Sequence, residues 1–130
     1  MVTILPYCAK EVFDPATYSQ AIKVTGAQTI LLLSGQVAYD EKGQPAYRGD
    51  FVGQARAVFR AIKAQVEAGG GSLANVVKVN TYLTDIRYRP DLLPVREEFF
   101  GKKMPASTLV EVSALAHPDW LIEVEAIAVL

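Results

Sequence analysis

Two pairs of polar side chains near the C-terminus have the types and spacing to take part in chemistry. Ser107 and Thr108 follow a Pro-Ala turn and open an alternating apolar run, so their hydroxyls could contact a ligand or simply begin a strand. Glu123 and Glu125 are two residues apart, and in a strand they would share one face. A carboxylate in a mostly apolar cleft has a raised pKa, which suits a general acid or base acting on water. The structural alternative is an ion pair with a lysine or arginine across a subunit boundary.

The single cysteine and the single histidine do not suggest a catalytic pair or a metal site. Cys8 cannot form an internal disulfide, and as a nucleophile it would need His117 as its partner. His117 lies in a segment typical of a turn, because Pro118 fixes φ and Asp119 can bond to the backbone. One cysteine and one histidine are too few ligands for structural zinc. We therefore expect an ordinary thiol in a reducing compartment, no metal and no other cofactor.

The composition predicts one domain and shows no feature typical of binding to nucleic acid or of spanning a membrane. The 130 residues are 51% hydrophobic, enough for one core, and we expect a single domain over residues 1–130. The net charge is −1 and the basic residues form no stripe, so nucleic acid is not an expected partner. The longest apolar run, Ile30–Leu33, is too short to span a bilayer, and no signal peptide is evident. These features predict a cytoplasmic protein that binds a small molecule or another protein.

Two amphipathic segments predict the helices that would position these residues. After Asp50, a suitable N-cap, apolar residues recur at steps of three and four until Gly69–Gly71 ends the helix. A second helix is expected over Asp91–Phe100, with Pro94 in its first turn, where the missing N–H is harmless. The predicted buried residues of the two helices are Val52, Ala55, Phe59, Ile62, Val66, Val95, Phe99 and Phe100.

Five β-type runs complete a predicted β-β-α-β-α-β-β order. They are Tyr18–Val24, Thr29–Ala38, Val76–Ile86, Ser107–Leu115 and Leu121–Leu130. Only four residues separate the first two runs, which is compatible with a hairpin. In the third run, Val77, Val79, Thr81 and Leu83 are expected on one face. The fold class is therefore α+β, and two helices can cover only one face of the sheet.

The second face of the last strand predicts association between copies of the chain. It bears Glu123 and Glu125 together with large aliphatic side chains. At about 25 cal/mol per Å² of apolar surface, leaving these side chains in water would forgo several kcal/mol. We therefore expect a homo-oligomer in which sheets pack on one another.

Several segments, in their order and spacing, resemble the Rid (YjgF) family of enamine/imine deaminases. Together they cover nearly the whole chain. The resemblance implies a chorismate-mutase-like fold, a homotrimer and ligand sites in the clefts between subunits. It also implies hydrolysis of reactive 2-imino acids to 2-oxo acids and ammonia. The matching segments are Tyr18–Ala21, Ser34–Gln36, the amphipathic helix with its glycine stop, Val76–Asp85, Glu98–Phe100, Pro105-Ala106 and Ile122–Ala128.

The resemblance also implies roles for individual residues. Glu123 matches the glutamate that positions the attacking water, and Tyr18, Ser34 and Gly35 match residues that line the cleft. Ser107 stands where the family has the arginine that binds the substrate carboxylate. A serine offers one neutral donor in place of a bidentate guanidinium, a loss of roughly 2–4 kcal/mol in carboxylate affinity. Ser107 and Thr108 are better suited to an uncharged oxygen.

Three functions remain open on the sequence. The leading one is a Rid-like hydrolase acting on an enamine, imine or related small reactive metabolite, which need not be a 2-imino acid. The alternative is a non-catalytic trimer that binds a small metabolite or a protein, and Ser107 favours it. A third is an enzyme of one catabolic pathway, such as an aminomuconate-type deaminase. A replacement cation could come from Arg87, Arg89 or Arg96, each of which is otherwise a solvated surface residue.

Overall fold

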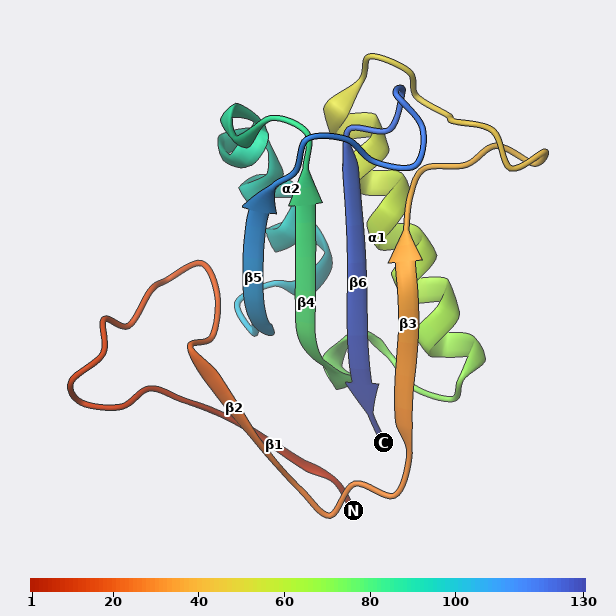
Figure 1. Cartoon of the computed structure of the whole chain (residues 1–130). Helices are drawn as coiled ribbons and strands as arrows, with labels where there is room; N and C mark the ends of the chain where they lie inside the picture. The colour runs from red at the N-terminus through yellow and green to blue at the C-terminus, as the bar shows by residue number, and fades with distance from the viewer.

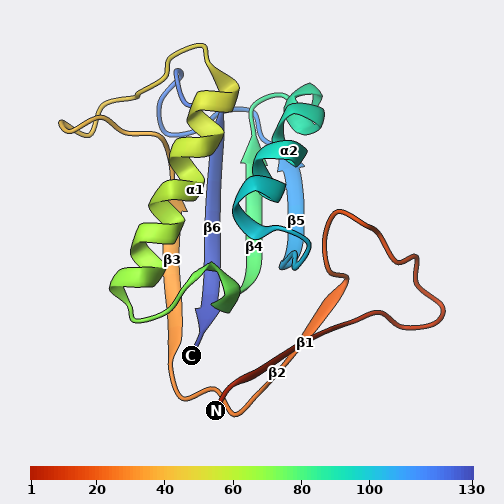
Figure 2. The same cartoon turned by 180° about the vertical axis from the view of Figure 1, so that it is seen from behind.

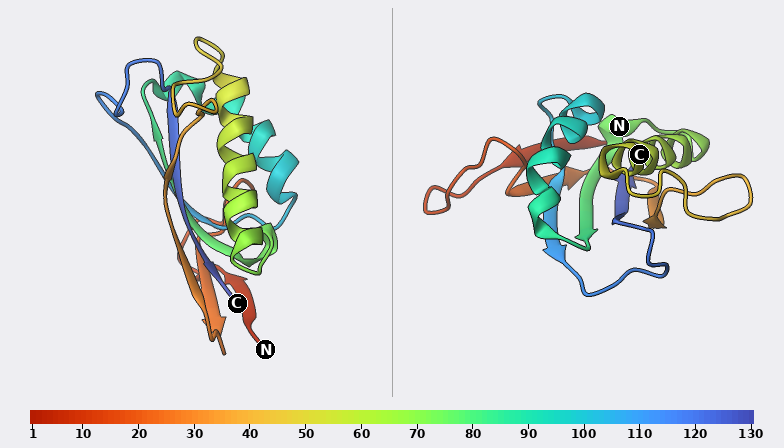
Figure 3. Two further views of the ribbon diagram at one scale, coloured as in Figure 1. Left: turned by 90° about the vertical axis from the view of Figure 1, so that its right-hand side faces the viewer. Right: turned by 90° about the horizontal axis from the view of Figure 1, so that it is seen from above.

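Two helices pack on one face of a four-stranded sheet in the computed structural model, which describes residues 1–130 (Figure 1 and, from behind, Figure 2). The strand order is β3-β6-β4-β5; β4 and β5 are parallel, and β6 is antiparallel to both of its neighbours. The strands are β3 (Ile30–Gln36), β4 (Val76–Leu83), β5 (Ala106–Glu111) and β6 (Ile122–Val129). Figure 3 shows the helices in one layer and the other face of the sheet uncovered. The predicted α+β arrangement with helices on one face is confirmed.

The first helix forms as its sequence predicts. In α1 (Phe51–Ala68), the Asp50 carboxylate accepts a hydrogen bond from the Gly53 N–H at 2.9 Å and so caps the helix. The helix ends before Gly69, and Gly70 has a φ of +97°, a conformation that glycine adopts without strain. The short 3₁₀ turn η1 (Leu73–Asn75) then leads into β4.

The second helix begins earlier than expected. The 3₁₀ turn η2 (Ile86–Tyr88) leads directly into α2 (Arg89–Phe100). Pro90 lies at the N-terminus, so the predicted place of Pro94 in the first turn is wrong, and Pro94 lies inside the helix. The side chain of Pro94 is exposed, so its ring lies on the solvent side of the helix and does not enter the core.

The N-terminal strands form their own two-stranded sheet. A strand that was not predicted, β1 (Thr3–Tyr7), pairs antiparallel with β2 (Ala21–Thr25). The predicted hairpin between the first two β-type runs is therefore wrong, because β2 pairs with β1 and β3 pairs with β6. In Figure 1 the pair runs from the lower end of β3 toward β5. There Ser19 bridges to Ala106, and the Ser19 N–H donates to the Pro105 carbonyl at 3.2 Å.

The core lies between the sheet and the two helices. In β6, the residues that alternate with Glu123 and Glu125 are buried in the core, namely Ile122, Val124, Ala126 and Ala128. In β4 the pairing with β6 shifts between Val76 and Lys78. Val76 is therefore buried in the core, whereas the sequence predicted Val77 on that face. The fully buried large side chains of the core include Phe59, Ile62, Leu83, Leu92 and Ile122.

Candidate functional site

Glu123 lies on the uncovered face of the sheet, and its carboxylate packs against the backbone of Gly35. Strands β3 and β6 pair from Ile30 to Leu33 and resume at Gln36 opposite Val124, so Ser34 and Gly35 form a bulge. A Cβ on Gly35 would lie 2.6 Å from Cδ of Glu123 and closer still to its Oε2. Glycine at position 35 therefore provides the space that the Glu123 carboxylate occupies.

The neighbouring carboxylate on this face has a different environment. Glu125 Oε1 accepts a hydrogen bond from the Tyr82 hydroxyl at 2.5 Å and from Asn80 Nδ2 at 3.2 Å. The hydrogen bond to Glu125, and then burial, raise the pKa of Tyr82 above its ordinary value. Glu123, in contrast, accepts no hydrogen bond and forms no ion pair within the chain. Of the two carboxylates, Glu125 is held by β4 and Glu123 is free to bind water or a ligand.

Ser107 and Thr108 point to opposite sides of the sheet. Ser107 is in register with the buried Val79 and lines a pocket on the helix side. Thr108 points to the uncovered face, where its hydroxyl accepts a hydrogen bond from Lys78 Nζ at 3.0 Å. The two hydroxyls predicted as neighbours in one site therefore do not share a pocket within one protomer.

Tyr18 joins Ser107 in a pocket of about 290 Å³ beside β5. The loop before β2 brings Tyr18 to this edge of the sheet through the bridge from Ser19 to Ala106. The predicted site residues thus fall into two groups, Tyr18 and Ser107 on the helix side, and Ser34, Gly35, Thr108 and Glu123 on the other. Within one protomer, the sheet itself separates the two groups.

Of the three arginines considered as replacement cations, Arg96 lies buried in this pocket and not on the solvated surface. Arg96 is only 3% exposed, and its Nη2 donates to the Thr17 carbonyl at 3.0 Å. Burial, and then the positive charge of Arg89, lower the pKa of Arg96. Arg96 follows Leu92 by four residues, the spacing of one helix face, so helical periodicity could have placed it on the buried side of α2.

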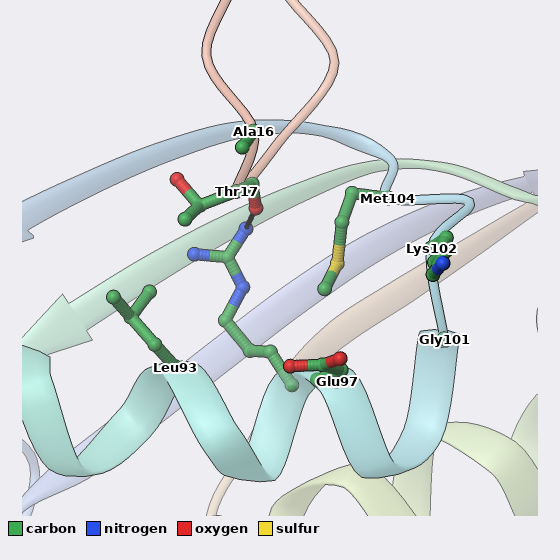
Figure 4. A pocket seen from close by; sticks show the side chains of 8 residues that line it. Ala16, Thr17, Leu93, Glu97, Gly101, Lys102 and Met104 are labelled. Carbon is green, nitrogen blue, oxygen red and sulfur yellow. Dashed lines mark hydrogen bonds between the residues drawn. The ribbon is translucent and has the colours of Figure 1, made fainter.

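A second cavity, of about 450 Å³, adjoins Arg96 between α2 and the loop before β2. Figure 4 shows it with Leu93 on the helix and with Thr17 and Met104 across from it. Both cavities therefore meet at the Arg96 side chain. No group of three or more His, Cys, Asp or Glu side chains is arranged to hold a metal ion. Neither helix combines the length and the hydropathy needed to cross a membrane.

Comparisons with known proteins agree with this architecture. The sequence model of the family described as Endoribonuclease L-PSP matches residues 10–130. The chain belongs to this family, the Rid (YjgF) family. A RutC family protein of Pyrococcus horikoshii is 45% identical over 85% of each chain. The 2-iminobutanoate/2-iminopropanoate deaminase of Dermatophagoides farinae is 33% identical, over 87% of this chain and 85% of that protein.

The Rid fold is also found among solved structures. A Rid-family protein of unknown function from Yersinia pestis superposes with a TM-score of 0.87 and 25% identity, covering 98% of each chain. The resemblance seen in the sequence is therefore confirmed at the level of family and fold. At that level, Rid relatives named as imine deaminases support a deaminase-type function for this chain.

Proposed function

We propose that residues 1–130 act as one domain, a deaminase that hydrolyses a small enamine or imine, with Glu123 orienting the attacking water. The observation that carries this proposal is the free carboxylate of Glu123, which is half-buried against Gly35 and accepts no hydrogen bond from the chain. A carboxylate in such a position can hold a water molecule and transfer its proton. The named activity of the Dermatophagoides farinae relative supports the same chemistry.

The reaction needs one proton acceptor that then becomes a donor. As the water oxygen bonds to the imine carbon, Glu123 takes a water proton and passes it to the nitrogen. In the resulting carbinolamine, the same carboxylate takes the hydroxyl proton and passes it to the amino nitrogen, which becomes the leaving group. The carbon–nitrogen bond then breaks, and a 2-oxo product and ammonia leave when the substrate is a 2-imino acid. An enamine enters the same route as its imine tautomer, which forms when one proton is gained at carbon and one is lost from nitrogen.

We also propose that the site is completed by a homotrimer packed through the uncovered face. Ile30 and Leu32 lie on this face with 64% and 77% of their surfaces exposed, and Val110 is also exposed. Covering such side chains is favourable, at about 25 cal/mol per Å². Association would also allow the Ser107 pocket of one protomer to lie near Glu123 of the next. This would explain why the two groups of predicted residues are separated within one chain.

Ammonia release from freshly generated 2-iminobutanoate tests the proposal, and Glu125→Gln is the matched control for Glu123→Gln. Both variants replace a carboxylate on the same face of β6 by an amide. Loss of general acid/base catalysis lowers rates by about 10²- to 10⁴-fold, so we expect that loss in Glu123→Gln alone. Equal turnover by Glu123→Gln and the unaltered protein would rule out the hydrolytic role.

Ser107 favours a second candidate function, a trimer that binds a small metabolite without converting it. The family resemblance implies a guanidinium where this chain has the neutral hydroxyl of Ser107, so the framework could bind a ligand other than a reactive imino acid. In that case the unaltered protein would accelerate the hydrolysis of no imine, and Glu123→Gln would leave ligand affinity unchanged. Measurements of turnover and binding on the same preparation therefore separate the two functions.

A further inference from the structure

Arg96 is a buried cation without an acidic partner. It forms no ion pair, and the only hydrogen bond of its guanidinium is the one to the Thr17 carbonyl. A guanidinium has five N–H donors, so most of those on Arg96 have no acceptor in the chain. Thr81 Oγ1 is the only side-chain polar atom that is fully buried and has no partner, so the unbonded nitrogens of Arg96 open into the pockets that it lines. They can bind a partner there that the chain itself does not provide.

The pocket around Arg96 is positively charged. Arg89 lies seven residues earlier in α2, on the same side of the helix, and lines the same pocket of about 290 Å³. The other lining residues are Tyr18, Ile86, Ser107 and Leu109, and none of them is acidic. Glu97 lines the adjoining cavity, but it forms no ion pair with Arg96, because successive residues of a helix do not face each other.

We propose that Arg96, assisted by Arg89, binds the carboxylate of a small organic acid in this pocket and so replaces the arginine absent at Ser107. A guanidinium binds a carboxylate through two parallel charge-assisted hydrogen bonds. The hydroxyls of Ser107 and Tyr18 line the same pocket and are available as neutral donors. The pocket volume suits a compact acid. The assignment rests on the proposed deaminase function for the identity of the acid, which is then the substrate.

Calorimetric titration of the assembled protein with pyruvate, a stable 2-oxo acid, tests the assignment. Hydrogen bonds to charged groups contribute about 1.5–3 kcal/mol, so we expect Arg96→Met to weaken pyruvate binding by about 10- to 150-fold. Arg96→Lys keeps the positive charge but not the paired N–H donors of the planar guanidinium, so we expect a loss of pyruvate affinity smaller than that of Arg96→Met. Arg60→Met, which removes an exposed arginine from α1, is the matched control and should bind pyruvate normally.

Restoration of binding distinguishes a binding role from a structural one. Arg96→Met/Ser107→Arg places a guanidinium at the other edge of the same pocket, and we expect it to regain pyruvate affinity. If Arg96→Met fails to fold, Arg89→Met provides the test, because Arg89 is exposed and forms no ion pair. Failure of the unaltered protein to bind pyruvate, or normal binding by a folded Arg96→Met, would overturn the assignment. Tighter binding of inorganic phosphate than of pyruvate would overturn the choice of a carboxylate.

The two proposals can fail separately. Normal pyruvate binding by Arg96→Met, together with loss of turnover in Glu123→Gln, would remove the Arg96 assignment and leave the deaminase intact. Loss of pyruvate binding in Arg96→Met, together with normal turnover in Glu123→Gln, would leave the carboxylate site and remove the hydrolytic role of Glu123. If both variants behave as expected, Arg96 binds the carboxylate on the helix side of the sheet, and Glu123 transfers the proton on the uncovered face.

Discussion

Replacing Gly35 by alanine should displace the Glu123 carboxylate while leaving the fold intact. The added Cβ would lie 2.6 Å from Cδ of Glu123, against an ordinary contact of at least 3.4 Å. The carboxyl carbon must therefore move by roughly 1 Å, and a misplacement of that size can lower a rate by about 10²-fold. We expect Gly35→Ala to reduce kcat for ammonia release by about 100-fold.

Stability should hardly change in the same variant. Gly35 does not have a positive φ, and the atoms that must move are the end of a flexible side chain. A compatible Gly→Ala replacement changes the free energy of unfolding by about 0.4–1 kcal/mol, and often stabilises. Urea denaturation at neutral pH measures this quantity, and we expect a midpoint close to that of the unaltered protein.

Gly69→Ala is the matched control for this experiment. Its Cβ would lie 2.7 Å from Cδ1 of Leu31, again the end of a flexible side chain, but far from any proposed catalytic group. It should keep full activity. Gly35→Ala combined with Glu123→Gln should be no slower than Glu123→Gln alone, because both changes act on one carboxylate. Full activity in Gly35→Ala would refute the argument that catalysis depends on the position of Glu123 over Gly35.

Two further predictions concern assembly and pH. Leu32→Glu places a charge on the uncovered face, through which the proposed homotrimer packs. Light scattering should therefore show a mass near three times 14.2 kDa for the unaltered protein and near that of one chain for Leu32→Glu. Ala64→Glu, on the exposed surface of α1, should keep the mass of the unaltered protein. If Leu32→Glu still has the mass of three chains, the interface between protomers does not include the part of the uncovered face around Leu32. Hydrogen bonds from Arg87 lower the pKa of Asp85 to about 2, so its stabilising effect is present at neutral pH and is lost as pH falls from about 4 to 2. Asp85→Asn should therefore unfold at a lower urea concentration than the unaltered protein at pH 7 but not at pH 2, and the difference should be small because Arg87 is exposed. Asp14→Asn, the control, should show no such pH-dependent difference. A difference between Asp85→Asn and the unaltered protein that is the same at both pH values would contradict the ion-pair origin.

The parts of the fold that were predicted correctly depend on local sequence. The cap at Asp50, the spacing of apolar residues through Val66 and the glycines that follow are local signals, and they are sufficient to predict α1. The alternation in β6 likewise identifies its buried face. Local periodicity therefore accounts for the helix-covered layer of the molecule.

The pairing of the N-terminal strands could not be predicted in this way. Two β-type runs separated by four residues favour a hairpin, yet β2 pairs with β1 across a long loop. Strand pairing is determined by contacts between distant segments, and Pro6 and the few apolar residues of β1 gave a weak signal. The same limit applies to the bulge at Ser34 and Gly35, which no spacing rule reveals and which brings Gly35 under Glu123.

The candidate site combines one feature that local patterns predict with one that they do not. Arg96 is on the buried side of α2 by helical spacing, but only the tertiary structure places it in one pocket with Ser107. A guanidinium that enters this pocket from α2 approaches a carboxylate from a different direction than one that extends from β5. The reacting carbon of a substrate held by Arg96 would then lie differently relative to Glu123. The substrates that this protein prefers should accordingly differ in shape from those that a guanidinium at position 107 of β5 would bind.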